Sequence, residues 1–139
     1  KKLIIRNPYQ IRPWQHVLEP LIGYLLLAEK QYHGKIKVLN NCWNFGPQKK
    51  SSKKVIEIVN YIKTIIKFDY KVKANNNIKE TEILKLNSLK AKKILGWFTK
   101  WTVNDALNKT IEWNNLVKKG VLPKNICEDQ LMCYLNKKK

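Results

Sequence analysis

The stretch that decides the fold is residues 11–24, which reads IRPWQHVLEPLIGY. Pro13 lacks a backbone N–H and disfavours a helical conformation at Arg12, the residue before it. We therefore expect residues 11–17 to form a short extended segment. An extended segment that passes directly into an apolar run predicts a strand followed by a helix.

The second half of this stretch has the signature of a helix start. Leu18-Glu19-Pro20 supplies an acidic residue near the cap and a proline suited to the first helical position. The helix is predicted to run to about Tyr32 and to end at His33-Gly34. It is apolar on most of its faces, so we expect it to lie between other elements.

Short apolar runs on both sides of this stretch predict further strands. The first is rich in β-branched residues and ends at Asn7-Pro8, and the second stops at Gly46-Pro47. The predicted strands or extended segments are residues 3–5, 39–45, 69–73 and 83–86.

Further helices are predicted from periodicity and caps. The clearest covers residues 53–67, where apolar side chains recur at three- and four-residue steps and lysines occupy the other face. The others are residues 87–95, capped by Asn87 and stopped by Gly96; residues 102–119, opened by a capping box of Thr102 and Asp105; and residues 127–135.

These elements predict a mixed α/β fold with a few short strands and about four to five helices. Strands separated by helices favour parallel pairing, and parallel strands need cover on both faces. The strands are too few for a complete doubly wound sheet. We therefore expect an incomplete sheet that extends a larger one, and read the chain as part of a longer protein.

The composition is strongly basic but is weak evidence for nucleic-acid binding. The 139 residues carry 28 basic and 10 acidic side chains, a formal net charge of +18, and 44% are hydrophobic. The basic residues comprise 26 lysines and only two arginines, Arg6 and Arg12. Proteins that read phosphates and bases usually favour arginine, whose planar fork bonds bidentately. The runs at residues 49–54 and 137–139 keep a basic binding module open as an alternative.

Several functional classes find no support in the sequence. No apolar run approaches the roughly 20 residues of a membrane span. The three cysteines contain no C-x-x-C pair, which suits reduced thiols in a cytoplasmic protein and makes a metal site unexpected. The five glycines lie at least 11 residues apart, so neither a dinucleotide motif nor a P-loop can be written. No catalytic residues can be assigned.

One group of residues does suggest binding chemistry. Arg12 stands beside the rigid Pro13 and the bulky Trp14. A stiff segment that places one guanidinium beside an indole suits a diphosphate, because the fork can take two oxygens at once. A surface or structural arginine is the alternative on these grounds.

The same stretch carries a resemblance to a known family. Residues 12–21 (RPWQHVLEPL), with Gly23-Tyr24-Leu25, resemble the CDP-glucose 4,6-dehydratases, a branch of the extended short-chain dehydrogenase/reductase family. Further resemblance lies at residues 5–8, 43–47, 80–86, 90–92 and 95–97, and in the helix with Thr110 and Trp113. It covers nearly the whole chain but only about the last two-fifths of such an enzyme.

The resemblance implies a division of labour. The chain would be the C-terminal, sugar-nucleotide-binding part of an extended Rossmann-type fold, with the NAD-binding domain and the catalytic residues absent. Residues 1–17 would form a strand and a phosphate-binding corner, 18–47 a helix and a strand completing the sheet, and 48–139 a helical substrate-binding region. NAD would serve the complete enzyme, and this chain alone would bind none.

The resemblance also implies roles for individual residues. Arg12 matches the arginine that grips the diphosphate of CDP-glucose, and Trp14 the aromatic position beside it. Arg6 matches a strand that borders the nucleotide base. His16, at a strand-to-helix corner, is expected to be structural. Around residues 77–79 the His-Pro-His of the family is missing.

The expected function is thus a substrate-binding fragment of a CDP-glucose 4,6-dehydratase, inactive alone and partnered by a separate N-terminal NAD-binding chain. A cytoplasmic location without membrane contact is expected. A basic module for nucleic acid or acidic surfaces, or a degenerate gene remnant, are the alternatives.

Overall fold

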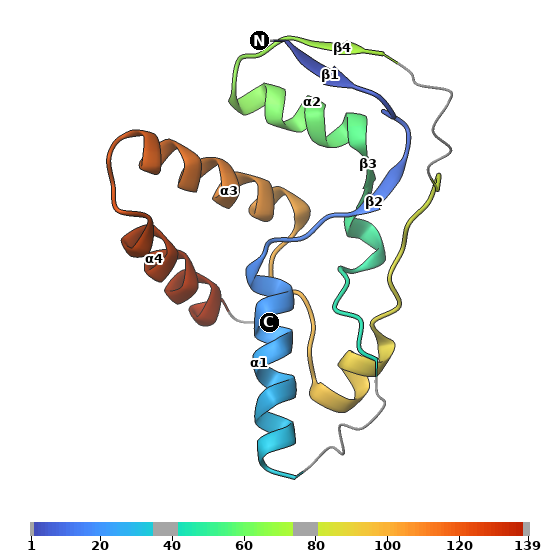
Figure 1. The fold of residues 1–139 in the computed structure, drawn as a ribbon, viewed down its shortest axis with the longest axis vertical. Helices are drawn as coiled ribbons and strands as arrows, with labels where there is room; N and C mark the ends of the chain where they lie inside the picture. The colour runs from blue at the N-terminus through green and yellow to red at the C-terminus, as the bar shows by residue number, and fades with distance from the viewer. Residues whose placement is uncertain (1, 35–41, 74–80, 138–139) are drawn as a thin grey trace. The chain divides into compact units, whose positions relative to one another are not determined.

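The computed structural model describes residues 2–34, 42–73 and 81–137 (Figure 1). The chain divides into two compact units, each built from two stretches of sequence. Unit 1 comprises residues 1–14 and 48–85, and unit 2 comprises residues 15–47 and 86–139. Each unit is described separately.

Unit 1 holds two small sheets and one helix. In the first sheet, β1 (Leu3–Ile5) pairs parallel with β4 (Tyr70–Val72). In the second, β2 (Ile11–Pro13) pairs antiparallel with β3 (Ser52–Lys54), which follows the single helical turn η1 (Lys49–Ser51). The parallel pair confirms the expected strands at residues 3–5 and 69–73.

Helix α2 (Val55–Ile65) follows β3 directly. Ile58 and Val59, on the apolar face that its periodicity predicts, are buried. At its N-terminus the Glu57 carboxylate accepts a hydrogen bond of 2.8 Å from the backbone N–H of Lys54. This helix confirms the one predicted over residues 53–67, although its first two residues belong to β3 instead.

Unit 2 is helical within the described residues. Its α-helices are α1 (Leu18–Tyr32), α3 (Val103–Lys118) and α4 (Pro123–Asn136), and a π-helical turn, η2, covers Ala91–Leu95. One core cluster is made of Phe45, Ala91, Leu95 and Trp97, with Leu26 and Leu27 of α1 packed against it. Gly23 is needed for this packing, because a Cβ atom there would overlap the Phe45 ring.

A fully buried carboxylate ties the parts of unit 2 together. The Glu19 side chain accepts hydrogen bonds from the backbone N–H groups of Lys100 and Trp101 and from the hydroxyl of Tyr134. Its backbone carbonyl accepts a bond of 2.9 Å from the indole N–H of Trp97. Buried charges persist only when they are bonded in this way. Glu19 therefore holds the start of α1 against the 97–101 segment and α4.

The mixed α/β class with few strands, small open sheets and several helices is as predicted. Helix α1 ends where expected, but it begins at Leu18, so Pro20 is its third residue. The capping box of Thr102 and Asp105 opens α3 as predicted. None of the helices in the described ranges is long and apolar enough to cross a membrane.

Three expectations about elements were wrong. The predicted strand at residues 39–45 lies partly outside the described residues, and Cys42–Phe45 forms no strand, because Phe45 packs into the core instead. The pairing of β2 with β3 is antiparallel rather than parallel. Helix α4 begins at Pro123, four residues early, because proline occupies its first position.

Candidate functional site

Unit 1 places the candidate phosphate ligand on the sheet of β2 and β3. Arg12 and Lys53 are directly opposite in the register of this antiparallel pair. Their side chains therefore leave the same face of the sheet, and like charges in this arrangement repel one another. Lys53 is partly compensated by Glu57, whose carboxylate lies 3.6 Å from its Nζ atom. An anion bound over this face would reduce the repulsion further.

The Arg12 guanidinium is held in one orientation by its own unit. Its Nη1 atom donates to the backbone carbonyls of Ile11 and Thr81, at 3.0 and 2.9 Å. Its Nη2 atom donates to Oε1 of Gln10 at 2.6 Å. Three bonds on one guanidinium reduce the rotamer freedom that ligand binding would otherwise remove. The arrangement suits a fixed anion-binding group and is equally that of a structural arginine.

Trp14 directly follows β2, and hydrogen bonds hold it against the neighbouring strand, β3. Its indole N–H donates to the carbonyl of Lys53 at 3.0 Å, and its backbone N–H donates to Ser51 at 3.2 Å. The structure thus brings Arg12, Trp14 and Lys53 together; we call these three residues the Arg12 corner. Arg6 is not part of it, because it is an exposed residue directly after β1, in the other sheet.

Sequence reasoning missed Lys53 in this corner, and it missed the two residues that bond the Arg12 guanidinium from outside the corner, Gln10 and Thr81. Lys53 was assigned to a helix, so its pairing with Arg12 was not expected. Gln10 lies two positions before Arg12, and alternation along a strand places both side chains on one face. That alternation was the one sequence signal that could have placed Gln10 beside Arg12. The segment at residues 77–79, where the family motif is missing, lies outside the described residues.

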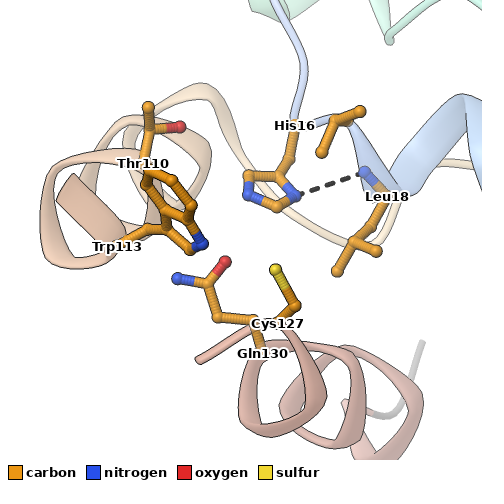
Figure 2. Close-up of a pocket in the computed structure, with 7 residues that line it drawn as sticks. His16, Leu18, Thr110, Trp113, Cys127 and Gln130 are labelled. Carbon is orange, nitrogen blue, oxygen red and sulfur yellow. Dashed lines mark hydrogen bonds between the residues drawn. The ribbon is translucent and has the colours of Figure 1, made fainter. Parts of the chain in front are cut away.

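Unit 2 contains a cavity of about 280 Å³ between the start of α1, α3 and α4 (Figure 2). Its lining residues are His16, Val17, Leu18, Thr110, Trp113, Cys127 and Gln130. None of them carries a formal charge at neutral pH when the histidine is neutral. Sequence reasoning did not anticipate this cavity, because its walls come from three separated segments.

His16 is buried at the edge of this cavity. Its Nδ1 atom accepts a hydrogen bond of 3.3 Å from the backbone N–H of Leu18. Its ring stands edge-on to Trp101, with centroids 4.7 Å apart. Burial lowers the pKa of the imidazole, and the positive charge of Lys109 lowers it further. The ring is therefore neutral at pH 7.

Neither region shows a metal-binding cluster among its described residues. In the part of the chain that the structure describes, no three histidine, cysteine, aspartate or glutamate side chains gather closely enough to hold a metal ion. The turn after β1 leads into β2 and not into a helix, so it does not offer the strand-to-helix turn that holds a dinucleotide.

Comparison with known proteins supplies the family context. No protein-family model matches the chain. The chain is 38% identical over 135 residues to the CDP-glucose 4,6-dehydratase of Salmonella typhimurium, an alignment that covers 96% of this chain. The chain spans about a third of that relative, 35% of its length. This similarity confirms the resemblance noted in the sequence.

Proposed function

We propose that this chain is the C-terminal, substrate-binding portion of a CDP-glucose 4,6-dehydratase. The similarity over 96% of its length carries the proposal. In such an enzyme CDP-glucose loses water to give CDP-4-keto-6-deoxyglucose, and NAD carries a hydride within the reaction. This chain would contribute binding energy and orientation to that reaction, and not its acid, base or hydride acceptor.

The Arg12 corner is the proposed diphosphate site. Its guanidinium is fixed by Gln10 and Thr81, and Lys53 adds a second positive charge on the same face. A guanidinium held in one orientation beside a lysine ammonium places two positive charges where they can bind the two phosphate groups of a diphosphate. The half-buried indole of Trp14 would border the ligand beside the guanidinium. Arg6 stays a proposed neighbour of the nucleotide base, on the resemblance alone.

We propose that this chain by itself does not hold NAD. The strand β1 runs into another strand, and the glycines are too widely spaced for a phosphate-binding turn. We therefore propose that a companion NAD-binding polypeptide completes the enzyme. That companion would supply the glycine-rich turn and the catalytic groups.

Helix α1 supports the need for a companion. Its inner face packs on the core of unit 2, while a stripe along its outer face is apolar and exposed. The stripe, with exposed fractions, comprises Val17 (62%), Leu21 (44%), Tyr24 (55%), Leu25 (65%) and Tyr32 (89%). Glu29 is the one charged residue among the exposed positions of this helix. An uncharged stripe in a chain of net charge +18 is typical of a surface that another polypeptide covers.

The proposal is tested by activity and by selectivity. The chain mixed with CDP-glucose and NAD should form no 4-keto product, and product formation would overturn the proposed inactivity of the chain alone. Binding should require the sugar nucleotide: CDP-glucose should compete with CDP, whereas glucose should not. A basic binding module would instead bind duplex DNA more tightly than CDP-glucose, and its affinity for the DNA would fall as the salt concentration is raised. Such a preference would replace the proposal.

The three cysteines support a reducing compartment for this function. Cys42, Cys127 and Cys133 are all exposed and unpaired. Exposed free thiols are usual where the cell keeps cysteine reduced. We accordingly propose a cytoplasmic location.

A further inference from the structure

We propose that the cavity of unit 2 is a second ligand site, separate from the Arg12 corner, for a flat uncharged ring that carries an amide or lactam group. Its volume of about 280 Å³ is close to the lower end, about 300 Å³, of ordinary ligand pockets. A cavity of roughly 150 Å³ already holds benzene. One substituted ring, or a small bicyclic ring, therefore fits.

His16 offers the cavity a hydrogen-bond donor. Because Nδ1 accepts from the Leu18 N–H, the proton of the neutral ring is on Nε2. Figure 2 shows this second nitrogen turned away from Leu18 and toward the side of Trp113. Only 7% of the residue is exposed. No described residue is shown to accept from Nε2, so a ligand carbonyl would find a donor there that faces the cavity.

The cavity also offers one acceptor, at Gln130. The side-chain nitrogen of Gln130 donates to the carbonyl of Lys109 at 2.8 Å, which fixes the orientation of the amide. Its oxygen lies on the side of the cavity that faces His16 (Figure 2). Gln130 is 6% exposed. A ligand N–H would therefore meet an acceptor on the side of the cavity that faces the donor of His16.

The other walls exclude charge and favour a ring. Val17, Leu18 and the indole of Trp113 are apolar or aromatic, and the Thr110 hydroxyl is already bonded to the carbonyl of Ala106 at 2.8 Å. No charged side chain lines the cavity, so a charged ligand would meet no charged partner in its walls. A donor and an acceptor between apolar walls match the edge of an amide or lactam, with the indole available to stack on its ring.

Two cysteines on α4 provide a matched test in the full chain. Cys127 lines the cavity, and Figure 2 shows its sulfur turned toward His16 and Leu18. Cys133 lies on the same helix, is also exposed, and does not line the cavity. Alkylation by N-ethylmaleimide can be followed at each cysteine by mass spectrometry of peptides. A ligand in the cavity should protect the first thiol and not the second.

Benzamide is the probe. Toluene, which lacks the amide, is the control for hydrogen bonding, and benzoate, which carries a negative charge, is the control for charge. At twice its dissociation constant benzamide should slow alkylation of Cys127 about threefold, since only the empty form reacts, and should leave Cys133 unchanged. Toluene and benzoate at the same concentration should protect less. Equal protection of both cysteines, no protection by millimolar benzamide, or protection by toluene equal to that by benzamide would overturn the proposal.

A pair of variants gives an independent readout. Cys127→Trp fills the cavity and should abolish saturation transfer from the protein to benzamide in NMR, whereas Cys133→Trp should preserve it. Transfer that survives Cys127→Trp would contradict the site. CDP-glucose binding is measured on the same samples. Because the two sites share no residue, loss of one proposal leaves the other standing.

Discussion

The hydroxyl of Tyr134 lies 2.5 Å from Oε2 of Glu19, 115 residues earlier in the chain, and both side chains are buried. Burial and the neighbouring carboxylate both raise the pKa of this phenol well above its usual range. The phenol therefore stays protonated and donates to the carboxylate. This bond closes α4 onto α1 and so shapes the cavity between them.

Removing this hydroxyl should destabilise the protein. Tyr134→Phe removes the hydroxyl donor from Oε2 of the buried Glu19 carboxylate and leaves this oxygen only the longer bond of 3.2 Å from the Lys100 N–H. A hydrogen bond to a charged group contributes about 1.5–3 kcal/mol. We expect a loss of about 2 kcal/mol in the free energy of unfolding, measured in urea. Tyr32→Phe is the control, since Tyr32 is 89% exposed. Equal stability of the two variants would contradict the role of Tyr134.

Stability should fall on the acid side because of His16. The pKa of His16 is lowered in the folded state, so below its usual value of about 6.5 the unfolded chain binds more protons than the folded chain. Its contribution is fully present above pH 6.5 and is lost as the pH falls toward the folded pKa. His16→Asn keeps an acceptor for the Leu18 N–H and does not titrate. The stability of the wild type should therefore decline more steeply from pH 7 to pH 5 than that of the variant. Parallel curves would contradict the prediction.

Gly23 should not tolerate a side chain, although it lies within a helix. Alanine at this position gains about 1 kcal/mol of helix propensity. Overpacking costs roughly 1–3 kcal/mol, and the added Cβ would overlap the Phe45 ring. Because the overlap is with a buried ring of the core, we expect the packing cost to exceed the helical gain. Gly23→Ala should lower the thermal midpoint, and an unchanged or raised midpoint would show that the Phe45 ring can move aside.

The sequence was most informative where one local signal decides an element. Proline, capping residues and period 3.6 located α1, α2 and α3, and a β-branched run located β1. The short β3 was missed because its lysines read as the start of a helix, and its strand character comes only from pairing with β2. Tertiary pairing of this kind overrides local propensity.

The candidate site was predictable only in part for a similar reason. Arg12 stood out because it is one of two arginines among 28 basic residues. Gln10, Lys53 and Thr81 did not, since they meet Arg12 through strand register and a distant loop. The cavity likewise depends on side chains 114 positions apart, as from His16 to Gln130, which no local pattern connects. The roles of Arg12, Trp14 and Arg6 in binding stay predictions.

The exposed stripe on α1 should matter for assembly and not for stability. Leu25→Lys changes a residue that is 65% exposed, so the free energy of unfolding should shift by no more than about 0.5 kcal/mol. It should nonetheless prevent co-purification with the part of the Salmonella dehydratase that has no counterpart in this chain. Leu135→Lys, at a 51% exposed residue of α4, is the matched control and should retain the complex. The same result for both variants, whether retention or loss, would contradict the assignment of the stripe.

The affinity for CDP-glucose, measured by titration calorimetry of the wild-type chain and of Arg12→Ala, tests the central claim most directly. A charged hydrogen-bonded contact contributes about 1.5–3 kcal/mol, so the variant should bind about 10- to 150-fold more weakly. Lys92→Ala, which removes one exposed positive charge in unit 2, should bind like the wild type. Absence of binding by the wild-type chain, or equal affinity in wild type and Arg12→Ala, would contradict the account.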